Sequence, residues 1–229
     1  MSKPPTRPRL LDLFCGAGGA AMGYHSAGFE VVGVDIRPQP RYPFEFHQGD
    51  ALSFPLEGDW AVIHASPPCQ AYCDSNQGLH DGRRHPRLIE PIRERLLAWG
   101  GAYVIENVDR APLRGQLLLC GTMFGLRVIR HRIFEASVSL PLPPADCNHW
   151  GKVSEGDFAG VYGRGAKGPR YRSDDGRRAR WGRAPGDRPI TEWWAECMGV
   201  TWTTVRRDLT EMIPPAYTEW IGGCALRRL

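Results

Sequence analysis

Residues 9–35 read RLLDLFCGAGGAAMGYHSAGFEVVGVD. The apolar runs Arg9–Phe14 and Glu30–Asp35 flank a glycine-rich turn and a segment at about Gly18–Ala27. This pattern predicts a buried strand, a tight turn, a short helix that ends at Gly28, and a second strand. A strand–turn–helix–strand unit of this kind starts a parallel sheet, whose ligand crevice lies at the carboxyl ends of the strands.

The alternation of strands and helices continues along the chain. Further strands are predicted at Phe44–Gln48, Trp60–Ala65, Ala102–Glu106 and Arg132–Ala136, and further helices at Arg87–Trp99, Ile190–Cys197 and from Pro214–Pro215 to about Leu226. This order predicts an α/β fold with a doubly wound, mostly parallel sheet. Pro, Gly and Arg dominate from Pro141 to Pro189 without any period, so we divide the chain into residues 1–136, an irregular insertion at 137–189, and a returning segment at 190–229.

The composition is that of one globular protein, with 229 residues, 42% hydrophobic and 24% charged. No apolar run approaches the roughly 20 residues that span a membrane. The N-terminus is basic and proline-rich and lacks the apolar core of a signal peptide. Seven cysteines without regular spacing fit reduced thiols. We therefore expect a cytoplasmic protein without membrane association.

Basic residues gather in one segment. Residues 151–189 hold ten Lys or Arg against five Asp or Glu, with Tyr162, Tyr171 and Trp181 interleaved. Cations mixed with aromatic rings suit a phosphate backbone and unstacked bases. A solvated, flexible loop has the same composition, so both interpretations stay open.

The segment Ser66–Tyr72 reads SPPCQAY and follows the apolar run Trp60–Ala65. Its two prolines stiffen the backbone, so Cys69 sits in a rigid loop at the carboxyl end of a predicted strand. A thiol at that place is a candidate nucleophile, and a buried structural cysteine is the alternative.

Three acidic positions follow predicted strands. Asp35 lies about twenty residues beyond the glycine loop Asp12–Gly19, where nucleotide-binding α/β domains place an acid against ribose hydroxyls; a helix N-cap is the alternative. Asp50 could accept a hydrogen bond from an adenine amino group, or it could be a turn aspartate. Glu106 would face the crevice beside Cys69, where partial burial would raise its pKa and retain a proton; a capping or surface carboxylate is the alternative.

Arg130 and Arg132 precede an apolar strand and alternate onto one face. Two guanidinium groups there could bind a phosphate or a pyrimidine carbonyl, or they could belong to a solvated face.

Taken in order, the glycine loop, Asp35, Asp50, PPCQ at Pro67–Gln70, ENV at Glu106–Val108 and the Arg130–Arg132 pair resemble the DNA cytosine-5 methyltransferase family. The resemblance covers residues 9–136 well and 190–229 loosely, and the short chain looks like the compact solitary members carried by bacteriophages. It implies a Rossmann-like S-adenosylmethionine-dependent methyltransferase fold. Residues 1–136 would be the catalytic and cofactor-binding domain, and 137–189 a reduced target-recognition insertion.

The resemblance also implies a chemistry. The cofactor would be S-adenosylmethionine, the product S-adenosylhomocysteine, and the partner double-stranded DNA. Cys69 would attack C6 of a flipped-out cytosine, Glu106 would contact N3 and N4, and Arg130 and Arg132 would position Cys69 and the O2 edge of the base. The implied cofactor contacts are Phe14, Gly16, Gly18, Gly19, Asp35, Ile36, Asp50, Ala51 and Pro68. The expected nucleic-acid contacts are Gln70, Arg164, Lys167, Arg170, Arg172, Arg177, Arg178 and Arg180.

Several positions depart from the family pattern. Val128 stands where the family usually has Gln, Cys73 where Ser or Thr is common, and the segment Glu211–Pro215 lacks the usual Asn before its prolines. The recognition region is short, so we expect a monomer that reads two or three bases or needs a protein partner. The pair Cys147 and His149, with Cys120 and Cys197 elsewhere, matches no common zinc spacing, so we expect no metal.

Three other functions remain open. The first is an RNA cytosine-5 methyltransferase of the tRNA-acting branch, which shares the cysteine and glutamate motifs. The second is a catalytically silent nucleic-acid binder or accessory protein, against which the intact Cys69 and Glu106 count. The third is methylation of a free nucleotide, which needs no long basic segment.

Overall fold

The computed structural model describes residues 7–72, 85–161 and 184–228. Its strands are β1 (Arg9–Leu13), β2 (Glu30–Asp35), β3 (Glu45–Gln48), β4 (Trp60–Ala65), β5 (Tyr103–Asn107), β6 (Leu117–Leu119) and β7 (Arg132–Ala136). Its helices are α1 (Gly19–Ala27), α2 (Ile89–Trp99), α3 (Ile190–Met198), α4 (Arg206–Glu211) and α5 (Pro215–Leu226). The predicted strands and helices are all present, and β6 and α4 are additions that their short, weakly patterned sequences did not reveal.

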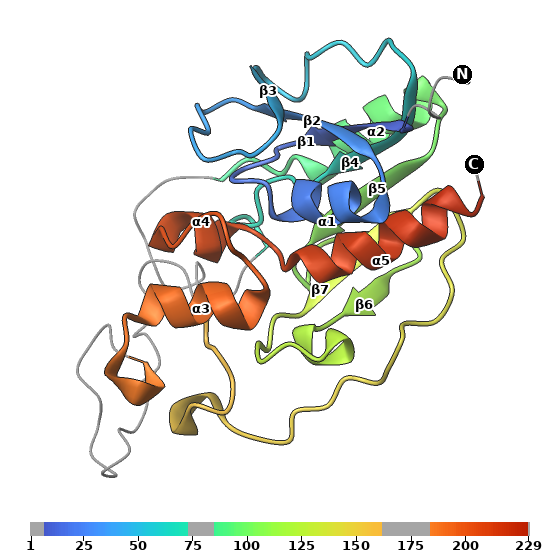
Figure 1. Ribbon diagram of the computed structural model, residues 1–229. Coiled ribbons are helices and arrows are strands. Elements are labelled where there is room, and N and C mark those ends of the chain that lie inside the picture. Colours follow the sequence, from blue (N-terminus) through green and yellow to red (C-terminus); the bar gives the residue numbers. More distant parts are fainter. Residues whose placement is uncertain (1–6, 73–84, 162–183, 229) are drawn as a thin grey trace, which may run out of the picture.

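The strands form one seven-stranded sheet in the order β3-β2-β1-β4-β5-β7-β6. The first five strands of this order run parallel, and β7 is antiparallel to both β5 and β6. α1 and α5 lie side by side on one face, as Figure 1 shows, and α2 buries Ile89, Ile92 and Leu96 in the core of the other face. The predicted doubly wound, mostly parallel fold is therefore confirmed.

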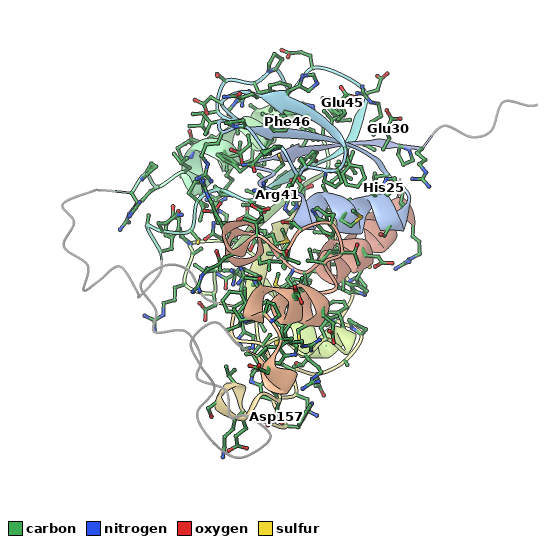
Figure 2. All side chains as sticks on the ribbon, turned by 60° about the vertical axis from the view of Figure 1, so that its left-hand side comes forward. His25, Glu30, Arg41, Glu45, Phe46 and Asp157 are labelled. Carbon is green, nitrogen blue, oxygen red and sulfur yellow. The ribbon has the colours of Figure 1, made fainter. Side chains whose placement is uncertain are left out.

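A second packing region lies beside the sheet. Trp193 and Trp194 of α3 and Leu209 of α4 share a cluster with Val128 and with residues of the insertion, including Val161. This cluster joins residues on both sides of the predicted boundary at residue 189. Arg41, labelled in Figure 2, ties α4 to the segment after β2 through its ion pair with Asp208, with Nε 2.5 Å from Oδ2. In the same figure Asp157 of the insertion lies at the far end of the molecule from β3, which carries Glu45 and Phe46.

Glycines set the close contact between α1 and α5. A Cβ atom at Gly23 would overlap the Pro215 carbonyl oxygen and Thr218 Oγ1, and one at Gly19 would overlap the Ile213 carbonyl oxygen. Thr218 Oγ1 also donates to the Ala20 carbonyl oxygen at 2.8 Å, which fixes the two helices together. The start of α5 is thus held against the first turns of α1, directly after the glycine loop.

We expect Gly23→Ala to destabilise the protein by about 3 kcal/mol, because the added methyl group would lie 2.0 Å from the Pro215 carbonyl oxygen, a backbone atom that cannot simply move aside. Such a loss would lower the melting temperature by roughly 6–12 °C for a chain of this size. Gly223→Ala is the matched control, since the nearest atom to its Cβ would be Arg227 Nη1 at 3.8 Å. In that helix interior alanine should stabilise by up to about 1 kcal/mol. Thermal unfolding checks both, and equal shifts would contradict the proposed α1–α5 contact.

Candidate active site

The strand order reverses at β1, which lies between β2 and β4. Because the connections that follow β1 and β4 lead to opposite faces of the sheet, a ligand crevice is expected outside the carboxyl ends of these two strands. The loop after β1 contains the glycines, and the loop after β4 contains Cys69. The two sequence motifs therefore flank the same switch point, with the end of β5 next to them.

The glycine loop has an unusual backbone. Phe14 has a φ of 58°, which is rare for a bulky residue, and Gly16 and Gly18 have φ values of 50° and 89°. The Gly16 N–H donates to Asp35 Oδ2 at 3.1 Å, and the Arg37 N–H donates to Asp35 Oδ1 at 2.9 Å. Asp35 thus fastens the loop to the end of β2. It caps no helix, since residues 36–72 contain none.

Next to Asp35, Ile36 is an exposed apolar side chain, 64% accessible. Asp50 makes an aspartate turn, because its Oδ1 accepts the Leu52 N–H at 2.9 Å. Asp50 Oδ1 therefore has the role of a turn aspartate, which was the alternative to a contact with adenine. Ala51 is buried in the core, and Arg95 of α2 donates to its carbonyl oxygen. The implied roles of Ile36, Asp50 and Ala51 toward a cofactor remain predictions.

Two residues at the glycine loop were given no role from the sequence. Asp12 is fully buried, and neither of its carboxyl oxygens has a hydrogen-bond partner within the described ranges. Burial, with Asp35 and Glu106 nearby, raises the pKa of Asp12 well above its usual range. Trp202, from the C-terminal segment, donates its indole N–H to the Ala17 carbonyl oxygen at 2.8 Å. No local pattern marks Trp202, because its partner is distant in the sequence.

The Cys69 loop is tied to β5. Asn107, which follows Glu106, donates from Nδ2 to the Pro67 carbonyl oxygen at 2.7 Å, and it is buried. Cys69 is partly buried, its carbonyl oxygen accepts the Tyr72 N–H at 2.9 Å, and Gln70 is exposed. These contacts fasten the backbone of the Cys69 loop to the end of β5.

Glu106 is buried at the carboxyl end of β5, 6% accessible. Arg132 Nε lies 3.0 Å from Glu106 Oε1, and the Ser66 side chain hydrogen-bonds to the carboxyl group. Desolvation raises the pKa of Glu106, although Arg132, Ser66 and Arg130 each act to lower it. A carboxyl group with a raised pKa can hold and donate a proton at a higher pH than an ordinary glutamate can. The surface alternative for Glu106 is excluded by its burial.

Arg130 is buried and hydrogen-bonds to two segments that are distant in the sequence. Its Nη1 donates to the Val161 carbonyl oxygen at 3.1 Å, and its Nη2 donates to the Thr210 carbonyl oxygen at 2.8 Å. Burial and the charge of Arg132 lower the pKa of Arg130, and Cys69 lies close enough to interact with it electrostatically. A nearby cation favours the thiolate form of a cysteine. The structure therefore brings Cys69, Glu106, Arg130 and Arg132 into one site, and the solvated face predicted as an alternative for the arginines is wrong.

A series of buried polar contacts leads from Tyr24 through His64 and Ser66 to Glu106. Tyr24 Oη lies 3.1 Å from His64 Nδ1, His64 Nε2 lies 2.9 Å from Ser66 Oγ, and Ser66 contacts Glu106. His64 is completely buried in β4, and no sequence pattern links it to Glu106. These contacts fix the Ser66 hydroxyl and through it the orientation of the carboxyl group.

Burial lowers the pKa of His64 to about 3. The unfolded chain therefore binds a proton below a pH of about 6.5 that the folded chain does not bind, so stability falls as pH falls through this window. Between pH 7 and 5 the loss through this group should be about 2 kcal/mol. We expect His64→Gln to remove most of that difference in urea unfolding. A variant with an unchanged pH difference would show that His64 is not held neutral.

Known proteins resemble this chain in sequence and in fold. No family model matches the chain. The type II methyltransferase M.HgiGI of Herpetosiphon aurantiacus is 33% identical over 120 residues, which cover 46% of this chain and 94% of M.HgiGI. The chain belongs to the DNA cytosine-5 methyltransferase family. A second relative from the same organism, M.HgiDI, is 33% identical over 120 residues, but the match spans only 38% of its length.

Solved structures share the fold of this family member over almost its whole length. The DNMT2 of Spodoptera frugiperda aligns with a TM-score of 0.65, 11% identity and coverage of 96% of this chain and 99% of that chain. A protein encoded within a prophage of E. coli, described as a DNA modification methyltransferase, aligns with a TM-score of 0.62, 14% identity and coverage of 97% and 99%.

The departures from the family motifs have structural contexts. Val128 is completely buried in the cluster with α3 and forms a β-bridge with Ala159, an environment that favours an apolar residue. Glu211 Oε2 accepts from Arg37 Nη2 at 3.1 Å, so the C-terminal motif reaches the loop after Asp35. Cys73 and the predicted contacts Arg164, Lys167, Arg170, Arg172, Arg177, Arg178 and Arg180 lie outside the described residues.

The spacing of Cys147 and His149, with Cys120 and Cys197 elsewhere, predicts no metal site. The structure brings Cys120, Cys147 and His149 together with His131, so that their ligand atoms all lie within 4.8 Å of one another. Cys197 does not belong to this set and is buried in the cluster of α3. The sequence spacing was uninformative because the four residues come together from three separate segments.

Within the described ranges, no helix is both long and apolar enough to cross a membrane.

Proposed function

We propose that this protein transfers a methyl group from S-adenosylmethionine to C5 of a flipped-out cytosine in DNA, through a covalent bond between Cys69 and C6. The observation that carries the proposal is the convergence of Cys69, buried Glu106 and two arginines at the switch point of the sheet. The sequence relatives, which are named type II methyltransferases, support a reaction on DNA.

The residues around the glycine loop fit the cofactor. When bound, S-adenosylmethionine supplies an electrophilic methyl group on a cationic sulfur. The buried Asp12 carboxyl group has no partner within the described ranges and suits a positively charged group. The first turn of α1 has no side-chain cap, so its amides suit a carboxylate. We assign the ribose to Asp35, the adenine to exposed Ile36 and Asp50, and the remaining contacts to Phe14, Gly16, Gly18, Gly19, Ala51 and Pro68.

The protein side chains activate the base. C5 of cytosine is a poor nucleophile, and addition of the Cys69 thiolate to C6 gives C5 the character of an enamine carbon. Glu106 donates its proton to N3, which neutralises the charge that develops in the ring. Arg132 holds the Glu106 carboxyl group, and the charge of Arg130 favours the thiolate. After C5 has gained the methyl group, loss of the C5 proton to solvent water, release of the Cys69 thiolate and return of the N3 proton to Glu106 restore the aromatic ring.

Access to C6 requires the base to leave the duplex. We assign the DNA backbone to the basic part of the insertion and to Gln70 beside the nucleophile. Arg130 bonds to the carbonyl oxygen of Val161, directly before that basic part. This contact supports a link between the recognition segment and the catalytic arginines.

The test is transfer of a labelled methyl group from S-adenosylmethionine to duplex DNA and to RNA, with identification of the modified base by mass spectrometry. We expect 5-methylcytosine in DNA. An N4-methylcytosine or N6-methyladenine product would refute the proposed chemistry. 5-Methylcytosine found only in RNA would assign the protein to the RNA-acting alternative, and cofactor binding without product on either substrate would favour an accessory protein.

A further inference from the structure

We propose that Cys120, His131, Cys147 and His149 bind one structural zinc ion. The four residues lie outside the proposed catalytic and cofactor contacts. Their position on the sheet edge and in the insertion gives the ion a defined place in the fold. The proposal depends on this cluster alone, and it stands whether or not the protein methylates DNA.

The distances between the ligand atoms fit a tetrahedral ion. Cys147 Sγ lies 3.0 Å from His149 Nε2 and 3.3 Å from His131 Nε2, and Cys120 Sγ lies 3.5 Å from His149 Nε2. Tetrahedral zinc, with Zn–S of about 2.3 Å and Zn–N of about 2.0 Å, places neighbouring sulfur and nitrogen ligands about 3.5 Å apart. All four atoms lie within 4.8 Å of one another, so small side-chain adjustments suffice to surround one ion.

The donor set selects the metal. Two thiolates and two imidazoles are the ligands of structural zinc sites, whereas magnesium and calcium require oxygen ligands. Four protein ligands leave no open position for a substrate, so the site is structural and not catalytic. Both cysteines are reduced.

A threonine supports the two sulfur ligands. Thr122 Oγ1 lies 3.5 Å from Cys120 Sγ and 3.8 Å from Cys147 Sγ, and it accepts the Asn148 N–H at 3.2 Å. Outer hydrogen bonds of this kind orient metal ligands and hold the ligand-bearing loop in place. The same hydroxyl group thus connects the segment after β6 to the loop that supplies Cys147 and His149.

The placement of the ligands explains what the ion would do. Cys120 directly follows β6, and His131 lies between Arg130 and Arg132 at the start of β7. Cys147 and His149 belong to residues 137–152, which form no helix or strand, and both are exposed. Residues 137–152 have no regular structure, and Cys147 and His149 are not buried against apolar side chains. Packing alone therefore holds this segment poorly. The ion would fasten the start of the insertion to the edge of the sheet that carries the two arginines.

The first experiment measures metal content. The full-length protein, purified without chelators from cells grown with added zinc, should contain about one zinc per chain by elemental analysis. Cys147→Ser and His149→Asn alter exposed ligands and should reduce the zinc content at least tenfold while the protein remains folded. Cys197→Ser is the matched control, because this cysteine lies outside the cluster. Folded wild-type protein without zinc, or variants that retain it, would overturn the proposal.

The second experiment identifies the ligands by spectroscopy. Cobalt(II) added to the metal-free wild-type protein should give the intense visible bands of a tetrahedral site and the ultraviolet charge-transfer band of bound thiolates. Cys147→Ser should weaken the charge-transfer band, and Cys197→Ser should leave it unchanged. The spectrum of an octahedral cobalt ion without thiolate ligands would refute the site. Neither measurement uses methyl transfer, so failure of the zinc proposal is distinguishable from failure of the proposed function.

Discussion

Replacement of Cys69 by alanine is expected to reduce methyl transfer to DNA by roughly 10³-fold or more, because the covalent route to an activated C5 is lost. The affinity for S-adenosylmethionine should stay within about twofold, since the glycine loop and Asp35 are held by contacts that do not include the thiol. Steady-state transfer of labelled methyl groups and calorimetric titration of the cofactor measure the two effects.

The matched control is Cys224→Ala, a buried cysteine of α5 outside the site. This variant should keep transfer within about threefold of the wild type. The covalent bond itself can be tested with duplex DNA that carries 5-fluorocytosine at the target base, because fluorine at C5 blocks the final elimination. A denaturation-stable complex should form with the wild type and not with Cys69→Ala. Full activity in the alanine variant would remove Cys69 from the mechanism.

Glu106→Gln is expected to lower kcat by about 10²–10⁴, the usual contribution of a positioned acid or base. Glutamine keeps the size and the hydrogen-bonding capacity of the side chain but carries no transferable proton. KM for DNA should change only a few-fold, and a loss confined to KM would contradict the protonation role. Glu94→Gln, at an exposed position of α2, serves as the control and should have no effect.

The pH dependence gives a second readout for Glu106. Desolvation raises its pKa, so the protonated form persists above the ordinary range of a glutamate. Transfer that depends on this proton should fall as pH rises through the raised pKa. The fraction of Cys69 present as thiolate increases as pH rises, which favours transfer. The wild type should therefore show a bell-shaped profile of kcat/KM. Glu106→Gln should lose the descending limb, and a variant that retains it would assign that limb to another group.

Local sequence patterns determined the order and type of most elements. β2, β4 and β7 occupy their predicted residues, and Gly28 ends α1 in the left-handed conformation as predicted. These features depend on apolar runs and on turn residues, whose preferences act over a few neighbouring positions. The motifs of the candidate site were equally readable, because each occupies one short stretch of sequence at or near the end of a strand.

Contacts between distant segments could not be read in this way. The bond from Asn107 to Pro67, the chain from Tyr24 through His64 to Ser66, and the contact of Trp202 with Ala17 each join residues far apart in the sequence. The spacing of glycines indicated a ligand loop, but Gly19 and Gly23 also permit α5 to approach α1.

The sequence by itself determined the parallel α/β sheet, its family and the residues that end its central strands. Only the tertiary structure decided which of those residues meet, that Glu106 is buried against Arg132, and that Cys120, His131, Cys147 and His149 share one place. The physical reason is the separation along the chain of the residues that interact. Periodicity and turn preferences act between neighbours in the chain, whereas burial, pKa and metal coordination depend on atoms that only the folded chain brings together.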